Sequence, residues 1–290
     1  MLTIGSMTVD TVTDIDPFAL PIGLLFPNRS IDALRPHEDV LAPYHVDFDA
    51  KHILLGVQSH LVRANGRTIL IDTCVGEHKD RAARADWNHR THTHYLQRLA
   101  DHGLTPDDID IVMCTHLHAD HVGWNTKLVD NRWVPTFPNA RYLVGRREFD
   151  FWRDAEQDRP RQHNHASFVD SVMPIVEAGQ IDLVDDGFEL APGLSLKALP
   201  GHTPGQMGLC LCHAQDRVLM CADAVHSIVQ VFNPHWATRF CSDPEAAVAT
   251  RLALFEDSVE QGTILVPAHL RHFDGLRVRR RGNSFVPDLI

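Results

Sequence analysis

The sequence predicts a mixed α/β fold with two β-sheets at its centre and helices packed against them. Strand-like apolar runs gather in two blocks, one before residue 75 and one between residues 181 and 221, and helical patterns follow each block. Helical patterns also flank the middle of the chain. A sheet with an apolar face must bury that face against another layer, so alternating blocks of strands and helices favour a layered arrangement.

The first 50 residues are interpreted as an N-terminal extension. Residues 2–12 alternate apolar and polar side chains, as an edge strand does. After them, the prolines at positions 17, 21, 27, 36 and 43 are expected to break any regular element. Apolar side chains between these prolines indicate that the extension packs across the domain, with an active-site lid or a dimer contact as the alternative.

Residues 52–178 are expected to form hairpins, single strands and helices. The strongest signals are the two-residue turns at Asn65-Gly66 and Asp130-Asn131, each between strand-like runs. The expected elements are a hairpin at 52–73, a helix at 89–102, a helical turn at 105–108, a strand at 109–114, a hairpin at 126–137, a strand at 140–144, and helices at 146–153 and 166–178.

The remainder of the chain is expected to hold the second block of strands and a long helix. Asp243 and Pro244 are typical of a helix start, and Gly262 is a typical stop after Glu260. The expected strands are 181–184, 188–191, 194–198, 207–212, 217–221, 263–266 and 276–281.

Composition and charge limit the kinds of partner. The net charge is 27 − 38 = −11, and the only basic run is the short Arg279-Arg280-Arg281. Neither nucleic acid nor an anionic membrane surface is therefore an expected partner, since both require concentrated positive charge. We find no secretory signal and no apolar run of about eighteen residues. We therefore expect a cytoplasmic protein with six reduced cysteines that acts on a small molecule, with a homodimer as a possible assembly.

The segment T-H-L-H-A-D-H-V-G-W, residues 115–124, concentrates metal-ligand chemistry. His116, His118, Asp120 and His121 fall within six residues directly after a buried strand-like run. Imidazole nitrogen and carboxylate oxygen are ligands that Zn²⁺ prefers. A polar surface loop in a chain with twenty histidines is the alternative, but four ligand-type groups at this spacing favour a metal site.

Three later strand-like runs also end at a ligand-type residue. His202 lies in G-H-T-P-G, Asp223 in A-D-A and His269 in P-A-H, each between small residues or prolines that allow close backbone approach. Taken singly, each is as well explained by a turn or a cap. Together with the histidine cluster they indicate one composite site.

This set of motifs resembles the metallo-β-lactamase-fold hydrolase superfamily. Asp72-Thr73 after the first hairpin is similar to that family's early Asp-Thr-Gly, and the order of the elements matches over roughly residues 50–275. The resemblance implies an αββα four-layer sandwich with a two-metal site at one edge. It also implies a single domain over residues 1–290, in which residues 122–180 form an insertion near the active site.

The resemblance also implies the ligands of both metals and the reaction. His116, His118 and His202 would hold one divalent cation, most simply Zn²⁺, and Asp120, His121 and His269 would hold the other. Asp223 would bridge the two. Two cations lower the pKa of a shared water from ~16 towards ~7 and supply a hydroxide nucleophile. Asp120 would then pass a proton to the leaving group.

Two residues beside this ligand set have expected supporting effects. Asp72 is a candidate partner for a ligand imidazole, because such rings usually hydrogen-bond through their second nitrogen. Cys74 replaces the Gly of the family's early motif, so a turn that needs a positive φ would be strained there.

The substrate is narrowed to the carbonyl of a small lactone or ester, or to a phosphotriester. The long spacing between His121 and His202 resembles the methyl-parathion-hydrolase-like and lactonase-like branches. His226 stands where acyl-homoserine lactonases carry a Tyr, which does not favour an acyl-homoserine lactone, and it is a candidate catalytic residue that donates a hydrogen bond to substrate. The alternatives are an iron-dependent, persulfide-dioxygenase-like oxidoreductase and a glyoxalase II-like thioester hydrolase.

Overall fold

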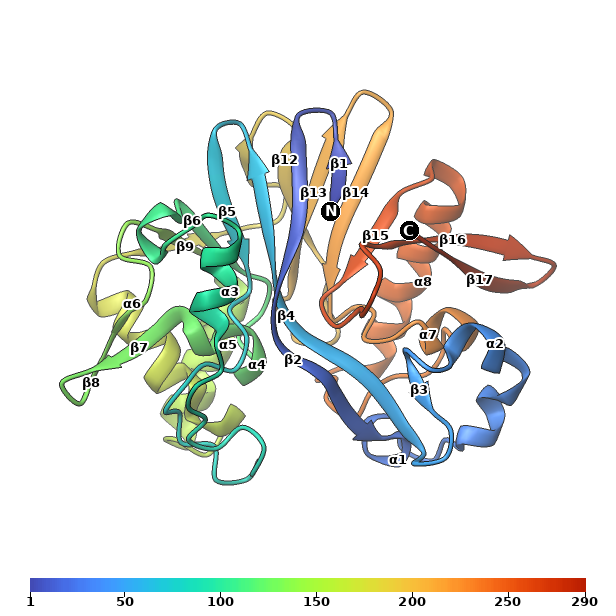
Figure 1. Ribbon diagram of the computed structural model, residues 1–290, viewed down its shortest axis with the longest axis horizontal. Coiled ribbons are helices and arrows are strands. Elements are labelled where there is room, and N and C mark those ends of the chain that lie inside the picture. Colours follow the sequence, from blue (N-terminus) through green and yellow to red (C-terminus); the bar gives the residue numbers. More distant parts are fainter. The chain divides into compact units, whose positions relative to one another are not determined.

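The computed structural model describes residues 1–290, which form two compact units (Figure 1). The first unit holds residue 1 and residues 6–14 and 57–188, and the second holds residues 2–5, 15–56 and 189–290. Two long strands, β2 (Met7–Pro21) and β4 (His52–Ala64), have residues in both units. The expectation of one domain over the whole chain stays a prediction.

Eight strands form the larger sheet, most of which belongs to the first unit. Besides β2 and β4, they are β1 (Leu2–Ile4), β3 (Val46–Asp47), β5 (Arg67–Ile71), β6 (Ile111–Cys114), β9 (Arg141–Gly145) and β10 (Ile181–Val184). The order is β1-β2-β4-β5-β6-β9-β10, with β3 beside β4. β5, β6, β9 and β10 run parallel, and every residue of β6 is buried, as a strand covered on both faces requires.

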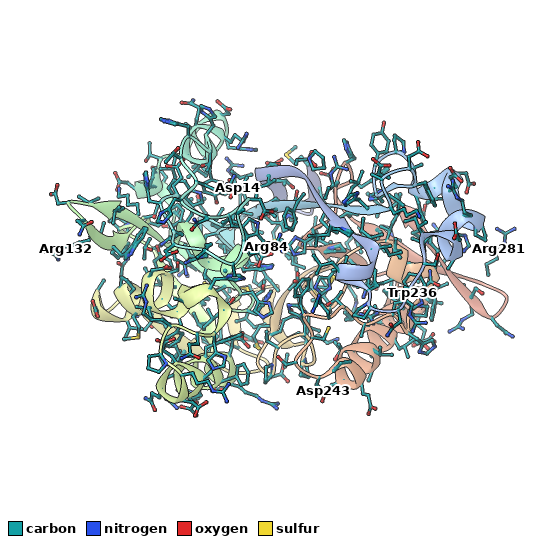
Figure 2. All side chains as sticks on the ribbon, turned by 90° about the horizontal axis from the view of Figure 1, so that it is seen from below. Asp14, Arg84, Arg132, Trp236, Asp243 and Arg281 are labelled. Carbon is teal, nitrogen blue, oxygen red and sulfur yellow. The ribbon has the colours of Figure 1, made fainter.

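The first unit also holds short helices and a separate hairpin. β7 (Thr126–Val129) and β8 (Arg132–Pro135) pair only with each other and extend away from the sheet, with Arg132 at the outer end (Figures 1 and 2). The helical elements are α3 (Tyr95–Asp101), η2 (Pro106–Asp108), α4 (Ala119–Val122), η3 (Gly123–Asn125), α5 (Arg146–Asp158), η4 (Asn164–Ala166), η5 (Phe168–Val172) and α6 (Met173–Glu177).

The second unit is built on a seven-stranded sheet in the order β11-β12-β13-β14-β15-β16-β17. Its strands are β11 (Glu189–Ala191), β12 (Leu194–Ala198), β13 (Met207–His213), β14 (Asp216–Ala222), β15 (Ile264–Pro267), β16 (Leu276–Arg281) and β17 (Ser284–Leu289). Its helices are α1 (Ile22–Leu25), η1 (Ile31–His37), α2 (Glu38–Leu41), α7 (Val229–Phe232) and α8 (Pro244–Gln261). In Figure 1, α8 lies beside β16. Asp243 caps the N-terminus of α8, and Arg281 is the last residue of β16 (Figure 2).

Several sequence expectations fail for identifiable reasons. The prediction that Pro17 breaks regular structure is wrong, because β2 continues to Pro21. β1 has only three residues, so most of β2 extends beyond it, and prolines within strands are accommodated at such edge positions. The expected strand 181–184 does not join the strands that follow it, because β10 pairs in parallel with β9 after the α5–α6 crossover.

Two expected helices are shorter than their sequence patterns. The helix expected at 89–102 begins only at Tyr95, because His89, His92 and His94 have positive φ angles that an α-helix excludes. The helix expected at 166–178 is divided into η5 and α6 near Pro174, which lacks an N–H to continue the ladder. No helix combines the length and the apolar character needed to cross a membrane.

Candidate metal centre

The ligand-type residues follow the ends of strands in both units. In the first unit Asp72 follows β5 and His116 follows β6, two strands that pair in parallel. In the second unit Asp223 follows β14 and His269 follows β15, which also pair in parallel. Parallel neighbours end at the same edge of a sheet, so each unit gathers these side chains at one edge.

The first-unit cluster comprises His116, His118, Asp120 and His121. Nε2 of His116 lies 3.1 Å from Nδ1 of His118, and the rings of His116 and His121 are 4.0 Å apart. Nε2 of His121 lies 3.9 Å from Oδ1 of Asp120. His116 and His121 are buried, whereas His118 and Asp120 are partly exposed. The cluster therefore combines fixed imidazoles with a carboxylate that solvent reaches.

Asp72 makes the contact predicted for it and fixes two ring tautomers. Its Oδ2 accepts from Nδ1 of His121 at 2.8 Å and from the Thr115 hydroxyl at 2.8 Å. The Thr115 oxygen lies 3.1 Å from Nδ1 of His116. Because the hydroxyl proton is directed to Asp72, Nδ1 of His116 must be the donor in that contact. Both His116 and His121 are thereby left with a lone pair on Nε2, the form that binds a cation.

Two side chains, Glu148 and Asn164, support the backbone of the loop that carries His116 and His118, a role that sequence reasoning missed. Glu148 of α5 accepts from the Leu117 N–H at 3.0 Å and from the Trp152 indole at 2.6 Å. The Trp152 ring packs edge-on against His118, with centroids 5.5 Å apart. Asn164 accepts from Ala119 N and donates to Leu117 O. No local sequence pattern predicts that these residues contact a loop some 30 to 50 positions earlier in the chain.

The second-unit cluster is centred on Asp223. Its Oδ2 lies 3.3 Å from Nε2 of His202 and 3.1 Å from Nε2 of His226, and its Oδ1 lies 3.2 Å from Nε2 of His269. All four residues are buried. The structure thus brings together the three second-unit residues of the expected ligand set and adds His226 to them.

The contact between His269 and Asp223 is a test of whether a cation fits. Nδ1 of His269 donates to the carbonyl of Gly56 at 2.7 Å, so in the neutral ring Nε2 carries a lone pair. That lone pair faces a carboxylate oxygen at 3.2 Å. Two acceptors at this distance in a buried place require a proton or a cation between them. The nitrogen and oxygen donors are those that a divalent metal such as Zn²⁺ prefers.

Two thiols lie beside the second-unit cluster. Sγ of Cys241 lies 3.9 Å from Nδ1 of His202, and Cys221 of β14 precedes Asp223 by two residues. Burial raises the pKa of both thiols, so in the metal-free chain they are protonated at neutral pH.

The backbone beside the ligands is unusually constrained. Cys74 has a φ of 55°, the strained conformation anticipated from its replacement of glycine. Gly201 has a φ of 130°, and a Cβ there would lie 2.2 Å from the backbone nitrogen of Ala247. The G-H-T-P-G motif therefore needs its first glycine because the loop carrying His202 lies against the first turns of α8.

A sequence profile of the family described as "Metallo-beta-lactamase superfamily" matches residues 52–269, well over half of the chain. The chain belongs to this superfamily. The metallo-hydrolase fold of the superfamily suggests divalent metal ions, and the two His/Asp clusters are the candidates for binding them.

Similar proteins of this superfamily include lactonases. An N-acyl homoserine lactonase of a Bacillus species is 26% identical over 126 residues, which are 43% of this chain and 42% of that protein. The chain thus matches less than half the length of the first such relatives. N-acyl homoserine lactonase AiiB of Agrobacterium fabrum is 26% identical over 64% of this chain and 69% of its own length.

Two solved structures share the fold over nearly the whole chain. AidC, described as a dizinc quorum-quenching lactonase, has a TM-score of 0.79 at 19% identity, covering 99% of this chain and 95% of that one. The hydrolase AbOPH has a TM-score of 0.81 at 24% identity, covering 100% of this chain and 96% of that one. The predicted fold class, an α/β fold of the metallo-β-lactamase type, is confirmed.

Proposed function

We propose that this superfamily member is a two-metal hydrolase that cleaves the lactone or ester carbonyl of a small molecule. The observation that carries the proposal is the opposition of the Nε2 lone pair of His269 and a carboxylate oxygen of Asp223. Such a buried pair requires a proton or a cation between the two atoms, and the nitrogen and oxygen donors suit a divalent metal. Membership of a metallo-hydrolase superfamily supports the same reading.

We further propose that the first-unit and second-unit clusters act as one site. His116, His118 and His202 would hold one metal, Asp120, His121 and His269 the other, and Asp223 both, with Zn²⁺ the best match to these donors. When bound, the metals would activate water as a nucleophile and polarise the carbonyl oxygen of the substrate. The tautomers set by Asp72 and Gly56 support Nε2 as the ligand atom of His116, His121 and His269.

Asp120 and His226 are the proposed catalytic side chains. Asp120 is partly exposed, so one of its oxygens can take a proton from water and deliver it to the leaving group. Nε2 of His226 lies 3.1 Å from Oδ2 of Asp223, and neither ring nitrogen of this buried residue makes a hydrogen bond. We assign Nδ1 as the atom that would donate to the substrate carbonyl oxygen.

The substrate class rests on relatives and on His226 together. The lactonase relatives favour a cyclic ester. We expect His226 to favour aryl esters and lactones other than acyl-homoserine lactones. Phosphotriesters are the secondary substrate class. The test is a panel of lactones, aryl esters, thioesters, β-lactams and phosphotriesters, assayed with protein loaded separately with Zn²⁺, Mn²⁺ and Fe²⁺. Hydrolysis confined to thioesters would support the glyoxalase II-like alternative instead.

Replacement of one candidate ligand from each proposed metal is the sharper test. His118→Ala and Asp120→Ala should each lower hydrolysis of the best panel substrate by at least about 100-fold, because neither water activation nor proton transfer survives. The control is His92→Ala, which removes an exposed histidine outside both clusters.

Wild-type turnover in both ligand variants, with unchanged metal content, would refute the assigned site. Protein purified without added metal that holds mainly iron, and that consumes oxygen without hydrolysing any panel compound, would establish the oxidoreductase alternative.

A further inference from the structure

Arg251 is a buried cation whose role neither the ligand set nor the core explains. It lies within α8 and is 1% exposed. No carboxylate forms an ion pair with it. Its guanidinium donates instead to three backbone carbonyls: Nε to Pro234 at 2.9 Å, one terminal nitrogen to Ala224 at 3.1 Å, and the other to Trp236 at 3.0 Å.

All three carbonyls belong to the segment 224–236, which directly follows Asp223 and contains His226. Gln230 links two parts of the same segment by hydrogen bonds. Its Oε1 accepts from the His226 N–H at 2.8 Å, and its Nε2 donates to the Trp236 carbonyl at 2.8 Å. The Trp236 carbonyl therefore accepts hydrogen bonds from both Gln230 and Arg251. Through these two side chains the backbone of His226 is connected to α8.

The N-terminal extension contacts the same segment. The His37 ring stacks on Phe232 with centroids 3.9 Å apart, and Phe26 lies 5.5 Å from Trp236. Trp236 can be located in Figure 2. These contacts are the packing role that the sequence indicated for the extension, and they are made by aromatic rings rather than by donors to carbonyls. Arg251 and Gln230, by contrast, hydrogen-bond the polar backbone of the segment directly.

Burying Arg251 has an energetic cost. Desolvation lowers the pKa of its guanidinium to about 10, so the side chain is still charged at neutral pH. Transferring a charge into the interior without a counter-ion is unfavourable, and an apolar side chain of similar volume is often at least as stable. Three charge-assisted hydrogen bonds offset part of the cost. Their common feature is that they fix one segment beside the candidate metal centre.

We infer that Arg251, together with Gln230, is a positioning residue that holds segment 224–236 so that Asp223 and His226 keep their mutual geometry. Only the predicted effect on kcat rests on the proposed function. The structural part of the inference concerns the order of the segment, which can be measured in a protein of any activity.

The experiment compares Arg251→Met, Arg251→Lys and Gln230→Met with a matched control, Ser258→Ala. Ser258 is a buried residue of the same helix, and its hydroxyl donates to Thr263 O at 2.7 Å, outside segment 224–236. Each protein is loaded with Co²⁺. The readouts are amide hydrogen exchange across 224–236, the visible Co²⁺ spectrum, and kcat and KM on the best panel substrate.

Arg251→Met and Gln230→Met should accelerate exchange in 224–236 selectively, alter the Co²⁺ spectrum, and lower kcat by roughly 10- to 100-fold with a smaller change in KM. Arg251→Lys, which keeps a cationic donor, should retain part of each signal. Ser258→Ala should lower thermal stability alone.

Wild-type exchange and an unchanged Co²⁺ spectrum in folded Arg251→Met would overturn the inference. If that variant does not fold, the same result in Gln230→Met would overturn it. A wild-type protein that hydrolyses nothing would refute the proposed function, while exchange and the Co²⁺ spectrum would still decide the positioning role.

Discussion

Asp72 shows how one carboxylate can organise several candidate ligands. It accepts from His121 directly, and it orients the Thr115 hydroxyl, which in turn accepts from His116. The Oδ1 of Asp72 also accepts from the Thr115 N–H at 2.7 Å. The side chain thereby sets both ring tautomers and the direction of the chain as it leaves β6.

Asp72→Asn should weaken metal binding without changing the size of the side chain. One oxygen becomes an NH₂ group that cannot accept from His121, so the ring loses its orienting partner, and affinity should fall roughly 10- to 100-fold. Competition against a chromophoric chelator measures this. Asp182→Asn, which alters an exposed ion pair with Arg141, is the control, and equal affinities in the two variants would contradict the tautomer argument.

At the scale of elements, a buried charge cluster joins the loop after β5 to β7 and η5. Arg81 makes a two-pronged ion pair with Asp170, with distances of 2.6 and 2.9 Å. Nζ of Lys79 donates to Thr126 Oγ1 at 2.6 Å and lies over the Trp133 ring at 3.5 Å. Two cations share one carboxylate there, and burial lowers the pKa of Lys79 to about 7.

The contribution of Lys79 to the stability of the protein should therefore become more favourable above neutral pH. Between the folded pKa of about 7 and the ordinary value of 10.5, the unfolded chain binds more protons at Lys79 than the folded chain does. Stability increases with pH wherever that holds, here by up to about 1.4 kcal/mol per pH unit. Below pH 7 both states are protonated, and the desolvation penalty is fully present.

Urea unfolding of the wild type and of Lys79→Met at pH 7, 8 and 9 measures this effect. The wild type should gain stability relative to the variant as the pH rises. Lys197→Met, at an exposed position, should follow the wild type. Parallel profiles for the wild type and Lys79→Met would show that the buried amine does not titrate in this range.

Local signals were sufficient for most elements, and they named His and Asp residues that the structure gathers in the two clusters. Asn65-Gly66 and Asp130-Asn131 gave correct hairpins, because positive φ at both turn positions is a property of the dipeptide itself. The continuation of β2 through Pro17 was not predictable, since it depends on how little of that edge β1 covers. Glu148 and Arg251 were missed for the same reason: their partners are carbonyls and amides far along the chain.

At the scale of the whole molecule, metal binding should contribute to stability, because a preformed set of ligands exists only in the folded chain. Chelation should lower the melting temperature, and Zn²⁺ should restore it. At a free concentration of 100 times Kd the gain is about 2.7 kcal/mol, or roughly 5 °C for a chain of this length.

Scanning calorimetry of the metal-free and reloaded protein measures that shift. Arg281→Ala, at the tip of the β16–β17 hairpin (Figure 2), should retain it in full. A shift that persists in full in the double variant His118→Ala, Asp120→Ala, which removes one ligand of each proposed metal, would place the stabilising metal outside the two clusters.

The interleaving of the two units in the chain has a consequence for how this protein can change over evolutionary time. Because β2 and β4 both pass from one unit to the other, neither unit corresponds to a continuous stretch of gene. A single recombination event cannot exchange one unit and leave the other intact. New specificities are therefore more accessible through substitutions and loop insertions, such as the one predicted at residues 122–180, than through domain shuffling.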